Sequence, residues 1–373
     1  MNDKIKLVHV IAGLTGGGRE RRMVELVKGL NSNEFYEQYV ILLNKAIDYP
    51  DIYKTDAKII VIDYPSKLET TKVIFRTLKT LRPSILHLWT EIHYVLILIS
   101  ILKPFLSYRL IVGFLADGNP VRKLLSRFAN RLAFTMADRI VSNSKAGVIA
   151  KNAPQNKTDV IYNGFSYSRF RNFPNYHKDL LKNELGIDTK YLVSMMARFN
   201  PAKDWDTFIN IAHIISRQRN DVLFLAIGQG ELLEHYKARV AELNLKNVKF
   251  MGFRSDIDKI LFCSDICLLC TNEKVHAEGV SNSIMEAMAA GRPVIATQGG
   301  GTQEIITNNV NGFIIQPCGD KEGAEIILNL ISSPNKMETI GDAAQTNIAQ
   351  HFSLDNMVKR YEYLYQNLLN HKQ

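Results

Sequence analysis

The chain has 373 residues, of which 46% are hydrophobic and 22% are charged, so it has the composition of a globular protein and the length of two domains. It contains no run of 18 apolar residues, and its first residues indicate a strand rather than a cleavable signal peptide, so we expect a cytoplasmic protein without a transmembrane helix. Residues 1–180 hold 27 Lys and Arg against 15 Asp and Glu. This excess favours phosphates or an anionic inner membrane face as partners over nucleic acid, for which no recognition motif is present.

Strands and helices alternate along the first half, where a glycine-rich turn at 13–18 separates the first strand from the first helix. We expect strands at 5–11, 39–43, 59–62, 85–89, 110–114 and 139–143, and helices at 19–30, 70–81, 121–136 and 145–151. Continuous apolar strands between helices are typical of a parallel sheet that is covered on both faces.

The alternation stops at 164–190, a polar and aromatic stretch that we interpret as the linker, and then resumes. The second half predicts strands at 192–197, 222–228, 248–252, 266–270, 294–297 and 313–315, and helices at 204–217, 232–243 and 356–369. The pattern predicts an α/β protein with two doubly wound domains. A cleft lined by the carboxyl ends of both sheets is expected between them.

The most informative stretch is 277–301, in which Glu278 and Glu286 flank a small polar run. The residues Ser281, Asn282 and Ser283 suit a loop that enters a helix, and a helix N-terminus binds phosphate. Glu286 could then accept hydrogen bonds from a ribose, and Glu278 would face the group attached to the phosphate. Alternatively, Ser283 and Glu286 form a capping box with a purely structural role.

Arg198 and Lys203 follow the first strand of the second domain, where two cations could neutralise a diphosphate without a metal. The alternative is a solvated basic loop. Gly17, within the first glycine turn, and Gly228, within a second, are weaker indications of phosphate binding because neither turn has the full spacing of a known phosphate loop.

Histidines and cysteines carry little functional signal. His87 and His93 follow the fourth predicted strand, and a lone histidine is more often structural than a ligand. The cysteines indicate a reducing compartment, and their spacing favours buried core positions over a metal site. They are Cys263, Cys267, Cys270 and Cys318.

Taken together, these motifs resemble the retaining glycosyltransferases of family four. The resemblance is strongest between 191 and 317 and rests on several segments spread over the chain. They are Arg198 with Lys203, Gly228 with Gly230, Gly252-Phe-Arg254, the stretch 278–297 with its two glutamates, ADRIV-x-NS at 137–144 and Tyr162-Asn-Gly164.

The resemblance implies a GT-B fold, with an acceptor domain at 1–175, a donor domain at 186–350 and a last helix at 353–370 that crosses back to the first domain. It implies a nucleoside-diphosphate sugar donor, such as a UDP-sugar, no cofactor, no metal, and retention of the anomeric configuration. Arg198 and Lys203 would hold the diphosphate, Glu286 the ribose, and Glu278 would face the sugar. The remaining donor-binding residues would be Gly17, Gly228, Phe253, Arg254, Ser281, Asn282 and Ser283.

Two departures concern the acceptor side. Many relatives carry a histidine in the loop after the fifth strand, where this chain has Asp117. Asp117 is the candidate catalytic substitute, or it only caps the turn at Pro120. Ser166 stands where relatives often have aspartate.

The expected function is hexosyl transfer from a nucleotide sugar to a hydroxyl acceptor, such as a lipid-linked glycan in surface polysaccharide synthesis. The apolar segment 94–106 would suit contact with an anionic membrane, or it is a buried helix. Two other functions share the fold: a catalytically decayed nucleotide-sugar-binding protein and a nonhydrolysing sugar-nucleotide epimerase.

Overall fold

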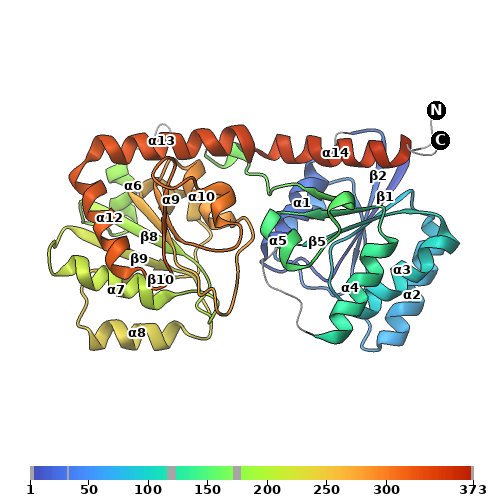
Figure 1. Ribbon diagram of the computed structural model, residues 1–373, viewed down its shortest axis with the longest axis horizontal. Coiled ribbons are helices and arrows are strands. Elements are labelled where there is room, and N and C mark those ends of the chain that lie inside the picture. The colour runs from blue at the N-terminus through green and yellow to red at the C-terminus, as the bar shows by residue number, and fades with distance from the viewer. Residues whose placement is uncertain (1–3, 32, 116–122, 171–177, 371–373) are drawn as a thin grey trace. The chain divides into compact units, whose positions relative to one another are not determined.

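The computed structural model describes residues 4–31, 33–115, 123–170 and 178–370. The chain divides into two compact units (Figure 1). Unit 1 comprises residues 1–164 and 354–373, and unit 2 comprises residues 165–353. Each unit is built on its own parallel sheet, so we describe them separately.

Unit 1 contains a seven-stranded sheet in the order β3-β2-β1-β4-β5-β6-β7. All of its strand pairs are parallel, as the continuous apolar strands predicted. The strands are β1 (Ile5–Ile11), β2 (Tyr36–Leu42), β3 (Lys58–Val61), β4 (Ile85–Leu88), β5 (Arg109–Leu115), β6 (Arg139–Ser142) and β7 (Thr158–Val160).

Helices cover both faces of this sheet because the side chains of each strand alternate between them. In β1, Leu7 and Ile11 join the core that includes residues of the C-terminal helix, whereas Val8 and Val10 join the core on the opposite face. The helices of unit 1 are α1 (Gly18–Gly29), α2 (Lys67–Leu81), α3 (His93–Leu106), α4 (Leu124–Met136), α5 (Lys145–Ala150) and α14 (Leu354–Asn370).

Unit 2 contains a six-stranded parallel sheet in the order β10-β9-β8-β11-β12-β13. Its strands are β8 (Tyr191–Met196), β9 (Val222–Ile227), β10 (Val248–Gly252), β11 (Ile266–Leu269), β12 (Val294–Thr297) and β13 (Phe313–Ile315). Its helices are α6 (Lys178–Glu184), α7 (Trp205–Ser216), α8 (Leu233–Glu242), α9 (Ile257–Cys263), α10 (Asn282–Ala289), α11 (Thr302–Ile305), α12 (Asp320–Ser332) and α13 (Pro334–His351).

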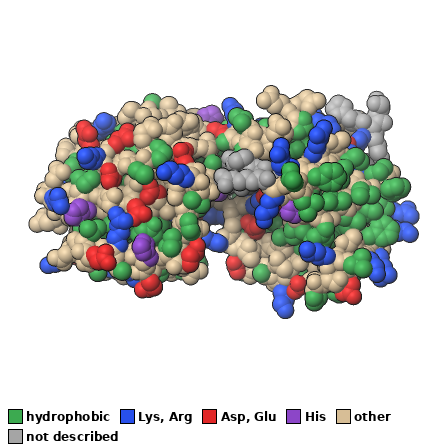
Figure 2. Space-filling model, turned by 60° about the horizontal axis from the view of Figure 1, so that its bottom comes forward, with side chains coloured by type: hydrophobic (Ala, Val, Ile, Leu, Met, Phe, Trp, Pro, Cys, Tyr) green, Lys and Arg blue, Asp and Glu red, His purple; other side chains and the backbone are tan. Residues whose placement is uncertain are grey.

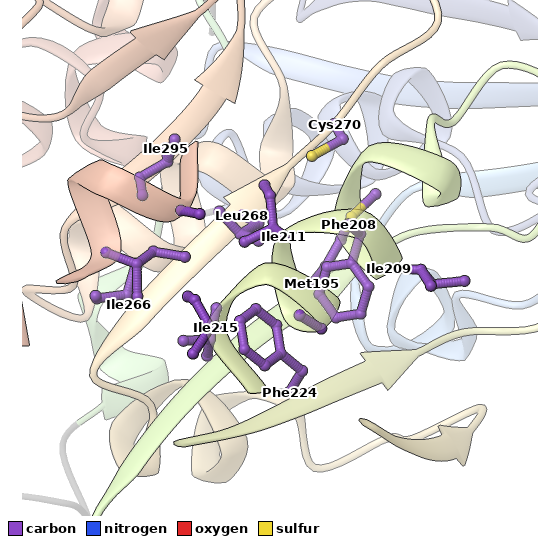
Figure 3. Packing of buried hydrophobic residues seen from close by; sticks show 14 of the residues in the cluster. Met195, Phe208, Ile209, Ile211, Ile215, Phe224, Ile266, Leu268, Cys270 and Ile295 are labelled. Carbon is purple, nitrogen blue, oxygen red and sulfur yellow. The ribbon is translucent and has the colours of Figure 1, made fainter. Parts of the chain in front are cut away.

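The core of unit 2 shows why these segments fold as they do. Phe208 and Ile211 of α7 point onto the sheet, where they meet Phe224 of β9 and Leu268 of β11 (Figure 3). Each of these side chains is almost completely buried, and burial of one such side chain stabilises the fold by about 1.5–3 kcal/mol. This packed core therefore holds in place the strands of unit 2, whose carboxyl ends lead into the candidate residues.

The predicted α/β architecture of two doubly wound sheets is confirmed, but the division of the chain differs from the prediction. Unit 1 ends at Gly164 rather than at 175. Phe165 already belongs to unit 2, since its amide donates to the Phe352 carbonyl (2.8 Å) and it forms a parallel bridge with Ser353. The predicted linker also contains a 3₁₀ turn, Tyr167–Phe170, and helix α6.

The apolar segment 94–106 forms most of α3, with Pro104 in the last turn. Val95, Leu96 and Ile99 are buried against the core of unit 1, so the alternative of a buried helix holds for this face. Phe105 points outward and is exposed. Among the described helices, none has both the length and the apolar character that crossing a membrane requires.

Candidate functional site

Helix α10 begins two residues earlier than the capping-box alternative requires. Ser281 is its N-cap, and the Ser281 side chain makes no capping hydrogen bond. Ser283 lies inside the first turn, where its hydroxyl donates to the Met196 carbonyl at the end of β8 (3.1 Å). The capping-box interpretation is therefore wrong, and the first turn of α10, with Asn282, is tied to the carboxyl end of β8.

Glu278 lies in a set of polar contacts before α10. Its carboxylate forms an ion pair with the Lys203 ammonium, and Oε1 also accepts a hydrogen bond from the Thr271 hydroxyl (3.3 Å). His276 Nε2 lies 3.8 Å from the other oxygen. The structure thus brings together two residues that lie 75 positions apart and that the sequence predicted to act on one ligand.

Three consecutive glycines at 299–301 form a turn that supports the backbone of Glu278. The Gly301 amide donates to the Glu278 carbonyl (2.8 Å), and Gly300 has a left-handed φ of +52°. A Cβ atom at Gly300 would overlap with that same carbonyl oxygen. The turn therefore requires glycine both for its conformation and for its close approach.

The loop between β8 and α7 carries Arg198 and Lys203. The Trp205 indole Nε1 donates to the Arg198 carbonyl (3.1 Å), and Lys203 forms an isolated antiparallel bridge with Thr271. Gly228 follows β9 with a φ of +143°, and a Cβ atom there would overlap with the Ala197 carbonyl. The close packing of this loop therefore requires a glycine at position 228. Packing alone thus explains a residue that the sequence predicted to bind phosphate.

Glu286 lies in the middle of α10 and is only 8% exposed. Its Oε1 accepts a hydrogen bond from Arg169 Nη1 (2.8 Å). Asp258 of α9 binds the same guanidinium at two points, through Nε (3.0 Å) and Nη2. Our sequence analysis missed both Asp258 and Arg169, and Arg169 lies in the stretch that we interpreted as the linker.

Phe253 and Arg254 follow β10, at the edge of the sheet and two strands away from β8. Phe253 is 71% exposed, and Arg254 forms a bidentate pair with Asp256 in its own loop (2.8 and 2.6 Å). An exposed aromatic ring beside a fixed guanidinium could bind a base, but neither residue makes a contact that identifies it as a site residue.

The candidate residues of unit 1 are Gly17 and Asp117. Gly17 is the N-cap of α1, as a strand-glycine-helix turn predicts, and its carbonyl accepts from the Tyr49 hydroxyl (3.2 Å). Asp117 lies outside the described residues.

Both histidines have structural contacts in unit 1. His87 lies within β4 rather than after it, is fully buried and contacts the Tyr365 hydroxyl through Nδ1 (2.7 Å). Burial lowers the pKa of His87 well below its ordinary value, so its ring is neutral. His93 begins α3, and its Nε2 lies at hydrogen-bonding distance from the Ser126 hydroxyl (2.5 Å).

The cysteines occupy the predicted core positions. Cys263, Cys267 and Cys270 are buried and Cys318 is exposed, and all four are free thiols. Burial raises the pKa of Cys267 to about 11, which disfavours the thiolate that a metal needs. Within the described ranges, no cluster of three His, Cys, Asp or Glu could hold a metal ion.

Comparisons with known proteins agree with this arrangement. Residues 177–347 match the family model described as glycosyl transferases group 1. The chain is 24% identical over 273 residues to an uncharacterized glycosyltransferase of Methanocaldococcus jannaschii, covering 68% of this chain and 67% of that protein. It is 26% identical over 177 residues to the poly(ribitol-phosphate) alpha-N-acetylglucosaminyltransferase of Staphylococcus aureus, covering 47% of this chain and 35% of that protein.

Similar solved structures extend over both units. Anabaena HepE in complex with UDP and glucose has a TM-score of 0.84 at 21% identity and covers 97% of this chain and 100% of that one. A glycosyltransferase of Rickettsia africae also has a TM-score of 0.84, at 20% identity, and covers 99% of this chain and 100% of that one. The alignments to the two curated relatives span between about a third and two thirds of their lengths. We conclude that this chain has a GT-B fold, and that residues 177–347 are similar to the glycosyl transferases group 1.

Proposed function

We propose that the protein is a retaining glycosyltransferase of family four that moves a hexosyl group from a nucleoside-diphosphate sugar to a hydroxyl acceptor. The observation that carries this proposal is the ion pair between Lys203 and Glu278 at the carboxyl ends of β8 and β11. Ligands of open α/β sheets bind at this edge. The group 1 match of this domain supports the assignment.

The difficult step is the departure of the diphosphate. The bond between the anomeric carbon and the phosphate oxygen breaks, and a bond to the acceptor oxygen forms on the same face of the sugar. The proton of the acceptor hydroxyl passes to the departing diphosphate. Arg198 and Lys203 neutralise the charge that develops on the diphosphate, and the amides of the first turn of α10 add to this stabilisation. Two fixed cations make this possible without a metal.

The two glutamates hold the neutral parts of the donor. Glu278 faces the sugar hydroxyls, and its pairing with Lys203 keeps it next to the diphosphate. Glu286, in the second turn of α10, accepts from the ribose hydroxyls. Gly17 lies near the phosphates from unit 1, and Asp117 acts on the acceptor side in place of the histidine of relatives.

We propose a UDP-sugar as the donor, because HepE binds UDP-glucose and shares the fold. The acceptor that we propose is a lipid-linked glycan in surface polysaccharide synthesis. Support comes from relatives such as the amylovoran biosynthesis glycosyltransferase of Erwinia amylovora, which is 28% identical over 212 residues. A glycan acceptor needs no cofactor beyond the nucleotide sugar.

A product assay tests the function. The full chain is incubated with UDP-, GDP- and ADP-hexoses and with lipid-linked glycans, and products are identified by mass spectrometry and by NMR of the anomeric proton. We expect one nucleotide sugar to give a glycoside with the donor's configuration. An isomerised nucleotide sugar would indicate an epimerase, and binding without turnover would indicate a decayed site.

We further propose that unit 1 binds an anionic membrane face through helix α4. Leu124 and Phe128 on this helix are 80% and 59% exposed, and Figure 2 shows hydrophobic side chains gathered on the visible face of unit 1. Beside them lies a groove of about 1060 Å³ with Arg127 and Arg131 in its lining. Apolar side chains next to cations suit the interface of an anionic bilayer.

Sedimentation with vesicles tests this surface. The wild-type chain should sediment together with phosphatidylglycerol vesicles. Most of the double variant, with Leu124→Ser and Phe128→Ser, should stay in the supernatant. Val310→Ser removes a similarly exposed apolar side chain from unit 2 and should change nothing. Equal sedimentation of all three proteins would exclude α4 as the membrane surface.

A further inference from the structure

Arg169 connects the start of unit 2 to the candidate site. It lies in the 3₁₀ turn Tyr167–Phe170, five residues after the last residue of unit 1. From this turn its guanidinium reaches Glu286 on α10 (2.8 Å) and Asp258 on α9. A single side chain thus joins two helices to the segment that enters the unit.

The guanidinium is fixed on several sides. Asp258 binds it in the bidentate geometry that orients an arginine most strictly, and the Phe165 ring lies 5.3 Å from its central carbon. The turn itself is anchored, because the Tyr167 hydroxyl donates to the Gln345 carbonyl of α13 (3.0 Å). Arg169 therefore has little freedom to follow a movement of Glu286.

Glu286, in contrast, has a long flexible side chain in a buried place. A carboxylate at this depth needs a partner for its charge, and Arg169 provides both the charge and a directed N–H. Burial lowers the pKa of Arg169, but the charge of Glu286 and the bonds to Asp258 outweigh it, so that the pKa is raised. Arg169 therefore keeps its positive charge next to this carboxylate.

The bond from Arg169 goes to Oε1 of Glu286, and a carboxylate has about four acceptor positions, so it can accept from several donors at once. We propose that Arg169 is a positioning residue, which holds the Glu286 carboxylate in the orientation that binds the ribose hydroxyls of the donor. This proposal rests on the proposed function, in which Glu286 binds the ribose. Asp258 acts one step further away, by fixing Arg169.

A merely structural ion pair predicts a different behaviour. Loss of a structural pair weakens the unit as a whole and lowers affinity for every nucleotide by the same factor. Loss of a positioning residue removes the contribution of the ribose hydroxyls and leaves the contributions of base and diphosphate in place. The two roles can therefore be separated by nucleotides that lack one hydroxyl.

The binding test uses the full chain and isothermal titration calorimetry. UDP, ADP and GDP are titrated first, and the tightest of them is then compared with its 2′-deoxy and 3′-deoxy forms. We expect the wild type to prefer the ribonucleotide by about tenfold or more, the effect of one hydrogen bond to a charged group. Arg169→Met should reduce this preference to less than about threefold at nearly unchanged affinity for the deoxynucleotide.

Two further variants serve as controls. Arg169→Lys keeps the charge but cannot bridge Asp258 and Glu286 with a planar fork. Its preference for the ribonucleotide should therefore lie between that of the wild type and that of Arg169→Met. Arg219→Met removes an arginine with a similar bidentate partner, Asp221, away from the site and should keep the full preference. An equal loss of affinity for both nucleotides in Arg169→Met would overturn the proposal.

A second measurement keeps the proposal testable if the wild type binds no nucleoside diphosphate, which would contradict the proposed function. Urea unfolding of Arg169→Met, Glu286→Gln and the double variant then measures the coupling free energy between the two side chains. We expect Arg169→Met to be clearly less destabilising when Glu286 is already glutamine. Additive effects would show that Arg169 does not act on Glu286 at all.

Discussion

The chain contains two tryptophans, one in each unit, and the contrast between them separates support of the core from support of the site. Trp89 follows β4 and is fully buried. Its indole Nε1 donates to His9 Nδ1 (3.1 Å), its ring lies 4.1 Å from that of His87, and the Arg22 guanidinium lies over it. All of these partners belong to the interior of unit 1.

Trp205 is just as buried but serves a loop. It is the first residue of α7 and stacks on Phe199 with ring centroids 4.0 Å apart. Its indole N–H donates to the backbone carbonyl of Arg198 (3.1 Å), and so fixes the loop that carries Arg198 and Lys203. Two side chains of the same type and burial thus differ in function because of the group that accepts their one hydrogen bond.

The largest effect should come from removing either ring. Trp89→Ala and Trp205→Ala should each lower the free energy of unfolding by about 3–5 kcal/mol, as buried aromatic truncations do. The difference lies in binding: only Trp205→Ala should also weaken nucleoside diphosphate binding. Urea unfolding and calorimetry check both, and a folded Trp89→Ala protein that no longer binds nucleotide would contradict the contrast.

Lys203→Ala tests the site that Trp205 supports. The variant should fold, but its kcat/KM should fall by about 10²–10³-fold, or about 3–4 kcal/mol, because the charge on the leaving diphosphate is no longer neutralised. Lys237→Ala, which removes a lysine from the exposed pair with Glu234, is the matched control. Unchanged turnover by Lys203→Ala in the product assay would exclude this role.

Acid should destabilise the interior around Trp89, because its hydrogen-bond partner His9 is a buried histidine. Burial lowers the pKa of His9 to about 3, against about 6.5 in an unfolded chain. Between these values the unfolded state binds more protons, so stability is present above about pH 6.5 and is lost as the pH falls. From about pH 7.5 to about pH 5, His9 alone should cost about 2 kcal/mol.

Urea unfolding at the two pH values measures this cost. His9→Gln, which lacks a titrating ring, should show a smaller dependence on pH than the wild type. A protein whose stability is as sensitive to pH with glutamine as with histidine would show that His9 is not held neutral by burial.

The smallest effect concerns the indole N–H alone. Trp89→Phe and Trp205→Phe should each cost about 0.5–1.5 kcal/mol for the lost hydrogen bond, plus the cost of the smaller ring. The Trp89→Phe protein retains Trp205 as its only tryptophan, so its fluorescence should change on titration with nucleotide. The emission of Trp205→Phe should not respond, and a response there would place Trp89 in contact with the site.

Much of this arrangement follows from patterns in the sequence. Continuous apolar strands predicted both parallel sheets, since a strand that is buried on two faces cannot alternate. The sequence analysis assigned Lys203 and Glu278 to one ligand, and the structure joins them in an ion pair. The sheets could be predicted because they depend on the periodicity of the apolar residues.

Residues whose role depends on a distant partner could not be found in the same way. Arg169 lies in a stretch without periodicity, and its partners Asp258 and Glu286 are 89 and 117 positions away. His87 could not be told from a ligand histidine, because only the packing of Tyr365 against it shows that its ring is enclosed. The donor contacts of Arg198, Phe253 and Arg254 stay predictions.

Helix α14 gives the chain an unusual order of assembly during synthesis. Unit 2 is continuous in sequence, whereas unit 1 needs α14, whose Met357, Tyr361 and Tyr365 fill its interior. A chain that emerges from the ribosome N-terminus first therefore makes most of unit 1 early and completes it last. The nascent protein must keep an apolar gap on unit 1 until translation has passed the whole of unit 2, and this exposed interval is where a chaperone would be needed most.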